Sequence, residues 1–288
     1  MRHPAYTIIF SATILLLTSC GNYTKLQKST NHDYKYEAAK QYYIEGQYNR
    51  ACLFLQDVIA MMKGTEKGEE SLFLLGMSSY KARSYDAAAT YFRKYYESYP
   101  KGIYTLKSHF YCGMALYKNI PEVKLDQTAT YEALHEFQEF MELYPEDELC
   151  SQAQDKIFAL QDRLIEKEYL SAKLYYDLGS YFGNCLNGGS NYQACIITAE
   201  NAIKDYPYTN RREDFAILIL RAKFELAAQS IESKKEERYH NAIDEYYGFM
   251  NEYPESKYVE EANNMYRKAR KYIPQEAQSA ETTGVTNQ

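Results

Sequence analysis

The stretch Glu69–Pro100, EESLFLLGMSSYKARSYDAAATYFRKYYESYP, decides the fold of this chain. Apolar residues recur at helical spacing in both of its halves, with a charged break between them. Gly76 and Ala88 are small where two helices would approach closely, and Phe92 fills the space beside them. Pro100 ends the second helix because it cannot donate a hydrogen bond to the preceding turn. The stretch therefore predicts a helical hairpin.

The same ending recurs along the chain, which indicates an internal repeat. Tyr-Pro pairs close four segments, and a small residue stands twelve positions before each proline. The pairs are Tyr99-Pro100, Tyr144-Pro145, Tyr206-Pro207 and Tyr253-Pro254, and the small residues are Ala88, Ala133, Cys195 and Ala242. An earlier segment lacks the proline, and we expect Lys63-Gly64 to end its second helix, with glycine as the C-cap.

This pattern resembles the tetratricopeptide repeat (TPR), a helix-turn-helix unit of about 34 residues. The resemblance implies an all-α fold, a right-handed superhelical solenoid of about five TPR-like repeats, each burying its apolar face against its neighbours. The expected repeats are 34–62, 69–100, 104–149, 152–208 and 212–253, with a final helix at about 256–272. The mixed charges of residues 234–238, KKEER, predict a solvated loop.

The N-terminal segment combines Arg2 with an apolar run from about Tyr6 to Leu17. This run has the length of a signal-peptide core and is too short to span a membrane. The following pattern, Leu17-Thr18-Ser19-Cys20, resembles the bacterial lipobox, in which the cysteine is acylated and becomes the mature N-terminus. The alternative is an ordinary signal peptide with an incidental cysteine. More than one acyl chain on Cys20 would anchor the protein stably to a membrane.

These features predict the organisation of the chain. We expect a lipoprotein signal peptide at 1–19, a lipidated flexible tether at 20–33, a five-repeat TPR-like domain at 34–273 and a disordered tail at 274–288. By resemblance to sorted lipoproteins, Gly21 after the cysteine favours the outer membrane. No acidic run follows Cys20, which favours the periplasmic face.

Composition and motifs argue against several classes of function. The net charge is -6 and Lys and Arg do not cluster, so a nucleic-acid partner is not expected. The sequence has no GxSxG, P-loop, HExxH or GxGxxG motif, and no His/Cys spacing suggests a metal site. We therefore predict no catalytic residue, no cofactor and no metal. Cys185 and Cys195 bracket the glycine-containing part of the insertion near 184–191 and could form a disulfide, or they are small buried side chains.

Tyrosine is unusually frequent, with 32 residues against no tryptophan. Tyr42, Tyr43 and Tyr80 fall on first helices, which line the concave face in repeats of this type. They are our candidates for a substrate-binding groove, because tyrosine joins a large apolar ring to a hydrogen-bonding tip. The alternative is that they fill the space between helices.

Residues 158–181, FALQDRLIEKEYLSAKLYYDLGSY, form the most specific motif. Together with FYCGMALY at 110–117 and the lipobox, they resemble the BamD (ComL) family, tetratricopeptide lipoproteins of the outer-membrane β-barrel assembly machinery. The motif residues expected to serve partner docking or structure are Asp162, Arg163, Glu168, Tyr169, Tyr175 and Tyr176. Alternatively, Asp162 and Arg163 pair locally with neighbours such as Glu166.

The resemblance implies a non-enzymatic scaffold at the periplasmic face of the outer membrane. In that family, C-terminal repeats hold a BamA-like β-barrel protein through its periplasmic POTRA domains, and N-terminal repeats are implicated in receiving the C-terminal signal of unfolded outer-membrane proteins. Two other hypotheses remain open: another periplasmic TPR adaptor lipoprotein linked to the cell wall or to division, and a glycan-binding lipoprotein, which the lack of tryptophan disfavours.

Overall fold

The computed structural model describes residues 24–179, 181 and 190–273. Over these residues the regular structure is helical and contains no strand, so the all-α prediction is confirmed. The chain divides into two compact units, Met1–Leu160 (unit 1) and Gln161–Gln288 (unit 2), which are described separately. Within the described residues, none of the helices has the length and apolar character that a membrane span requires.

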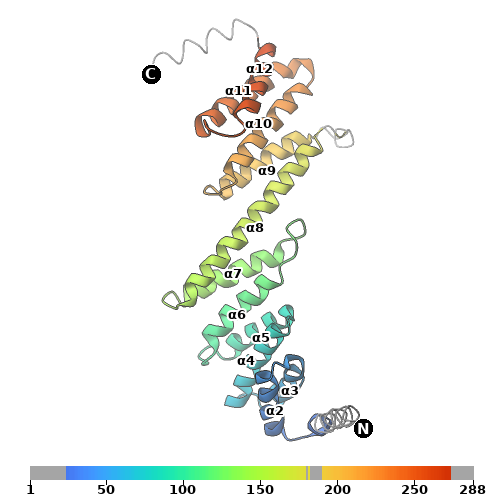
Figure 1. Ribbon diagram of the computed structural model, residues 1–288, viewed down its shortest axis with the longest axis vertical. Coiled ribbons are helices and arrows are strands. Elements are labelled where there is room, and N and C mark those ends of the chain that lie inside the picture. The colour runs from blue at the N-terminus through green and yellow to red at the C-terminus, as the bar shows by residue number, and fades with distance from the viewer. Residues whose placement is uncertain (1–23, 180, 182–189, 274–288) are drawn as a thin grey trace, which may run out of the picture. The chain divides into compact units, whose positions relative to one another are not determined.

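Unit 1 is built from helical hairpins in which each helix packs against the next (Figure 1). Its helices are α2 (His32–Ile44), α3 (Tyr48–Met61), α4 (Glu66–Lys81), α5 (Tyr85–Ser98), α6 (Thr105–Lys118), α7 (Thr128–Leu143) and the first part of α8 (Leu149–Asp177). The three hairpins α2–α3, α4–α5 and α6–α7 correspond to the first three expected repeats. The predicted glycine C-cap of α3 is wrong, because Met62 is the C-cap and Gly64, with φ of 84°, lies two residues further along the chain.

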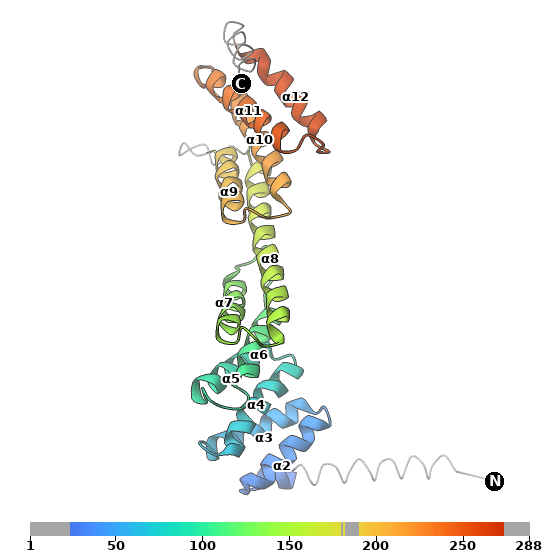
Figure 2. The same cartoon turned by 90° about the vertical axis from the view of Figure 1, so that its left-hand side faces the viewer.

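Unit 2 continues from the second part of α8. Its other helices are α9 (Asn191–Asp205), α10 (Arg212–Ala228), α11 (Glu232–Glu252), α12 (Val259–Ala269) and the short 3-10 helix η2 (Arg270–Tyr272). Helix α11 packs against both α10 and α12 (Figure 2). The prediction of a loop at residues 234–238 is wrong, because these residues lie in the first turns of α11. Lys, Glu and Arg are good helix formers, and their mixed charges only mark this part of α11 as solvated.

Close approach within the second and third hairpins depends on glycine, as the sequence predicted. A Cβ atom added to Gly76 of α4 would lie 2.7 Å from the ring of Phe92 in α5. The third hairpin repeats this arrangement, since a Cβ atom on Gly113 would lie 2.9 Å from the ring of Phe137. Both rings are fully buried. The predicted pairing of a small residue with a large ring is therefore confirmed in two successive repeats.

The four Tyr-Pro pairs end their helices in the same way. Each tyrosine is the C-cap, with φ between -133 and -127° and ψ between 56 and 66°. This backbone conformation lies outside the α region, which the following proline disfavours for steric reasons. In three of the pairs, the tyrosine ring packs on an aromatic ring one turn earlier, with centroids 5.4 Å apart. These are Tyr95–Tyr99, Phe140–Tyr144 and Phe249–Tyr253.

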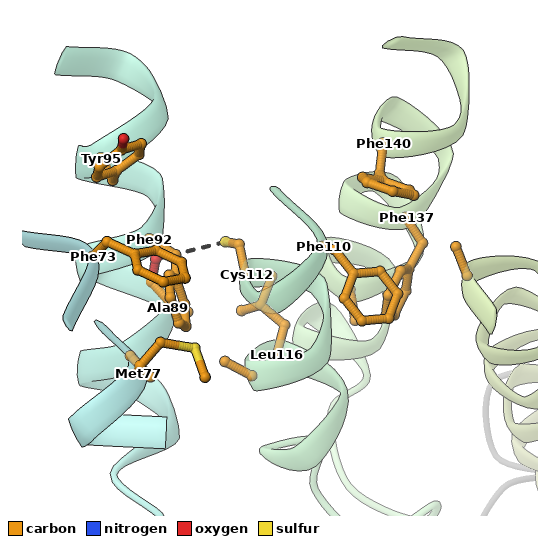
Figure 3. Close-up of a cluster of buried hydrophobic side chains, with 14 of the residues drawn as sticks. Phe73, Met77, Ala89, Phe92, Tyr95, Phe110, Cys112, Leu116, Phe137 and Phe140 are labelled. Carbon is orange, nitrogen blue, oxygen red and sulfur yellow. Dashed lines mark hydrogen bonds between the residues drawn. The ribbon is translucent and has the colours of Figure 1, made fainter. Parts of the chain in front are cut away.

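In unit 1 one core is continuous from the second hairpin to the third (Figure 3). Phe110 of α6 meets Phe137 and Phe140 of α7 edge-on, at centroid distances of 6.2 and 5.5 Å. On the other side of α6, the Cys112 thiol donates to the backbone oxygen of Ala89 in α5 at 3.6 Å (Figure 3). Helix α6 is thus buried from both sides, which is how a repeat array builds one core.

The segment before the first hairpin differs from the expected tether. Residues 24–28 are helical, and Leu26 is buried against Ala39, Ala51 and Phe54 of the first hairpin. A single buried apolar side chain therefore fixes part of a segment whose composition is polar. The signal peptide at 1–19, the lipid site Cys20, Cys185 and the tail at 274–288 lie outside the described residues, as does the insertion up to residue 189.

The turn inside the second hairpin holds Arg83 at a φ of 64°, in the left-handed region. The first hairpin has Gly46 at the equivalent place, with a φ of 75°. The residue after each of these two donates its backbone N–H to the carbonyl oxygen five positions earlier, from Gln47 to Tyr42 and from Ser84 to Ser79. For a residue with a Cβ atom this conformation costs about 1–2 kcal/mol, whereas glycine adopts it freely.

Arg83→Gly is therefore expected to raise the free energy of unfolding by about 0.5–1 kcal/mol, after the greater unfolded-state entropy of glycine is subtracted. Urea denaturation followed by circular dichroism measures the change. Arg83→Ala is the matched control, because it removes the charge and keeps the unfavourable φ. Equal stabilisation by alanine and glycine would count against a backbone origin.

Candidate functional site

The three candidate groove tyrosines lie on the first helices of their hairpins, as expected, and each is partly exposed. Tyr42 and Tyr43 belong to α2, and Tyr80 belongs to α4. Tyr42 stacks on Phe54 of α3 at a centroid distance of 5.7 Å, and the guanidinium carbon of Arg50 lies 5.7 Å from its ring centre. Tyr42 is therefore tied mainly to its own hairpin.

Tyr43 and Tyr80 each make a type of ring contact that also occurs in unit 2. In each case, a tyrosine near the end of the first helix meets, edge to face, a tyrosine near the start of the second helix. The pairs are Tyr43–Tyr48 (5.7 Å, 64°), Tyr80–Tyr85 (5.6 Å, 66°) and Tyr176–Tyr192 (5.8 Å, 63°). The sequence carries a trace of this repetition, because Ala-x-x-Tyr-Tyr-x-x-Gly occurs at both 39–46 and 172–179.

Burial gives these phenols a common electrostatic character. Burial raises the pKa of Tyr43, Tyr80 and Tyr176, and neighbouring acidic or phenolic groups raise each pKa further. The hydroxyl groups therefore stay protonated at neutral pH and can both donate and accept hydrogen bonds. A ring of this kind offers an apolar edge and a neutral polar tip to a partner chain.

Sequence reasoning missed one member of this surface, Tyr111 of α6. Its ring lies 5.6 Å from that of Tyr80, edge to face, and 5.8 Å from that of Phe92. Its hydroxyl group also contributes to the raised pKa of Tyr43. We call Tyr43, Tyr80 and Tyr111 the tyrosine row, since they come from α2, α4 and α6, the first helices of three successive hairpins. The feature of the sequence that could have indicated Tyr111 is its place in FYCGMALY, two residues before Gly113.

The motif in the second part of α8 has a mixed role. Tyr169 packs edge-on against Phe215 of α10 at 5.5 Å and lies beneath the Arg211 guanidinium at 4.7 Å. Arg211, which directly precedes α10, also forms an ion pair with Glu166. These contacts join α8 to α10 within unit 2.

The other motif residues do not converge on one point. Asp162 and Tyr175 are exposed, whereas Arg163 is half-buried. Glu168 is also half-buried, and burial raises the pKa of its carboxyl group. Tyr176 belongs to the hairpin contact described above. The motif therefore combines packing residues with an exposed remainder, and the latter is accessible to a partner.

Unit 2 also contains a groove that the sequence did not indicate. It has a volume of about 500 Å³ and is lined by residues of α9, α10 and α11. Lys223 of α10 is one of its charged groups and lies 2.6 Å from Glu245 and 3.5 Å from Glu200. The lining combines charged and apolar groups, which is typical of a surface that meets another folded protein.

The cysteines of the described residues take no part in these surfaces. Cys195 is a free thiol, fully buried in α9, and burial raises its pKa to about 12. A thiol of this kind is unreactive. Its potential disulfide partner, Cys185, lies outside the described residues.

Comparison with known proteins identifies the family. The sequence profile of YfiO, described as an outer membrane lipoprotein, matches residues 28–187. This chain belongs to the YfiO family of outer membrane lipoproteins. The match includes the tyrosine row and the whole of α8, and it ends before α9 begins. The sequence-based resemblance to BamD-like lipoproteins is confirmed.

A curated relative of this YfiO-family chain is the outer membrane protein assembly factor BamD of Caulobacter vibrioides. The two are 24% identical over 134 residues, which make up 46% of this chain and 44% of the relative. The chain therefore matches less than half of that protein's length. At the level of the family, the relationship supports a role in outer membrane assembly.

Solved structures similar to this YfiO-family chain include repeat proteins of other origins. The TPR2AB-domain–pHSP90 complex of yeast Sti1 has a TM-score of 0.38 and 14% identity, covering 83% of this chain and 98% of that chain. A Podospora anserina kinesin light chain with nearly identical TPR-like repeats has a TM-score of 0.32 and 14% identity, covering 85% and 97%. A protein-binding protein of Bacteroides ovatus has a TM-score of 0.30 and 11% identity, covering 76% and 100%.

Proposed function

We propose that this chain is a lipid-anchored, non-enzymatic component of an outer-membrane β-barrel assembly complex. The observation that carries the proposal is the YfiO family match over residues 28–187. The BamD relative of Caulobacter vibrioides supports the more specific assignment. The protein acts by position: an acylated Cys20 holds the helical hairpins at the periplasmic face of the outer membrane, where they bring other polypeptides together.

Unit 1 receives unfolded outer-membrane proteins at the tyrosine row. The C-terminal signal of such a substrate is an extended segment with an aromatic end, and its side chains can pack on the exposed edges of Tyr43, Tyr80 and Tyr111. The neutral hydroxyl groups can bond to its backbone. Extended peptides are commonly held by surfaces that combine apolar contact with hydrogen bonds of this kind.

Unit 2 docks a BamA-like β-barrel protein through its periplasmic POTRA domains. Two features support this division. The groove formed by α9, α10 and α11 has the mixed polar and apolar lining of a protein interface. The exposed residues of the α8 motif, Asp162 and Tyr175, add contact groups on the same unit.

Affinity purification from detergent-solubilised envelopes tests the function as a whole. We expect a large β-barrel protein with repeated periplasmic domains to co-purify with the tagged chain. Depletion of the chain is expected to reduce the porins inserted in the outer membrane. Recovery of a cell-wall or division protein without any β-barrel partner would contradict the proposal and favour the adaptor alternative.

Photo-cross-linking tests the placement of the substrate. A benzophenone amino acid at position 43 or 80 is expected to cross-link to unfolded outer-membrane proteins during their assembly, as detected by mass spectrometry. Position 176 is the matched control, because Tyr176 makes the same local contact in unit 2. Equal cross-linking at 176 and 80, or none at 43 and 80, would contradict a substrate site on the tyrosine row.

A further inference from the structure

A buried polar cluster lies between α6 and α7 and contains none of the residues of the tyrosine row. His109 of α6 and Glu136 of α7 are only 6% and 4% exposed, and Glu139 stands one turn beyond Glu136 at partial exposure. One ligand atom from each of the three residues lies within 4.8 Å of the others. An imidazole and two carboxylates form a donor set that suits divalent transition metals.

Two atoms of this cluster lack the hydrogen bonds that burial normally demands. In the described part of the chain, neither His109 Nδ1 nor Glu136 Oε1 has a hydrogen-bond partner, although both atoms are buried. Burying such an atom unsatisfied costs about 1–3 kcal/mol, so native proteins rarely leave one without a function. Here two of them face each other.

The distance between these atoms is longer than that of a good hydrogen bond and is compatible with an ion pair or with a shared metal ion. His109 Nδ1 and Glu136 Oε1 are 3.5 Å apart, which is too long for a good N–H···O bond. Two ligand atoms of a tetrahedral zinc ion, each bound at about 2.0–2.1 Å, would lie about 3.4 Å apart. The observed separation is therefore close to the one that a common metal ion requires.

The surrounding residues hold both ligands in this orientation. The ring of Tyr96 stacks on the His109 imidazole, with centroids 3.7 Å apart and planes 9° apart. The hydroxyl of Tyr96 donates to Glu136 Oε2 at 3.3 Å, and the Arg93 guanidinium lies 3.7 Å from the same oxygen. One carboxylate oxygen is thus engaged on the α5 side, which leaves Oε1 turned toward His109. Outer contacts of this kind accompany metal ligands in proteins.

Charge and access are also compatible with a cation. The cluster brings two carboxyl groups, of Glu136 and Glu139, beside one guanidinium group, of Arg93, so its acidic side chains outnumber the arginine. A surface cavity of about 330 Å³ lies beside it and is lined by Arg93, Thr128, Tyr131, Glu132, His135 and Glu136. An ion can therefore reach Glu136 from solvent.

We propose that His109, Glu136 and Glu139 form a zinc-class metal site that clamps α6 to α7. The site uses three protein ligands and leaves a fourth position for water. Because the ligands come from both helices of the third hairpin, the bound ion stabilises that hairpin and holds the α5–α6–α7 core together. The inference does not depend on the proposed role in β-barrel assembly.

Zinc binding by the full-length lipoprotein in detergent, stripped with a chelator, tests the site. We expect one zinc ion per chain, and a Co²⁺ complex with the visible absorption of tetrahedral coordination. Glu139→Gln, which changes a part-exposed ligand with little risk to folding, is expected to weaken zinc binding at least about 10-fold. His109→Gln is expected to abolish the Co²⁺ spectrum, with circular dichroism as the check on folding.

Glu142→Gln is the matched control, because Glu142 is an exposed glutamate on the same helix and lies one turn beyond Glu139. Its zinc affinity is expected to equal that of the unmodified protein. The proposal is overturned if the protein takes up no stoichiometric zinc. It is equally overturned if the Glu139→Gln and His109→Gln variants bind zinc with unchanged affinity, since the ion would then sit elsewhere.

Discussion

Phe92→Ala is expected to lower the free energy of unfolding of unit 1 by about 3–5 kcal/mol. The Phe92 side chain is fully buried, and it is the ring on which Gly76 closes. Phe73 and Tyr111 also contact it, at centroid distances of 6.0 and 5.8 Å. Gly76, which faces the ring, has no side chain that could move into the vacated space. Most of the cavity therefore remains.

Chemical denaturation followed by far-ultraviolet circular dichroism measures this loss. The matched control is Phe158→Ala, in α8, because Phe158 is 56% exposed. Its substitution is expected to change stability by less than about 0.5 kcal/mol. Similar losses for the two variants would mean that Phe92 is not the central packing residue of its hairpin.

Removal of the Cys20 thiol is expected to release the protein from the membrane. With an acylated cysteine, each buried methylene adds about 0.8 kcal/mol to membrane binding, and two or more chains make the attachment stable. A Cys20→Ala variant is therefore left without the acyl chains that would hold it in lipid.

The variant should be exported behind an ordinary secretory signal peptide, so that its processing does not depend on the thiol. Fractionation of the envelope on a density gradient, with mass spectrometry of the N-terminus, then measures attachment and acylation. Cys52→Ala, treated in the same way but with its own signal peptide, is the control and is expected to stay in the outer-membrane fraction. Persistent tight membrane association of the Cys20→Ala protein would argue against the lipid anchor.

The helical hairpins were predictable because their determinants are local and repeated. Phe92 and Phe137 each stand eight residues before the proline of their repeat, where they meet Gly76 and Gly113, and each Tyr-Pro pair changes the backbone at a fixed place. Steric rules of this kind act over a few residues and can be read from one sequence. The pairing of successive helices followed from the repeat itself.

Features that depend on contacts between separate helices could not be read from the sequence. His109 and Glu136 stand on different helices, and no short spacing links them, so the metal site was not expected. Leu26 was assigned to a tether because its neighbours are polar, yet one buried leucine suffices to hold that segment. The prediction of a loop at 234–238 is wrong for the opposite reason. The charged residues there mark only the solvent side of α11 and do not indicate a loop.

The edge-to-face tyrosine contact, which occurs separately in unit 1 and in unit 2, has a practical consequence for spectroscopy. The chain contains no tryptophan, so it has no intrinsic indole emission to obscure an introduced probe. A single indole in place of Tyr48 or of Tyr192 would occupy the same kind of edge-to-face niche in unit 1 or in unit 2. Fluorescence from each variant would then report the melting of one half of the protein at a time.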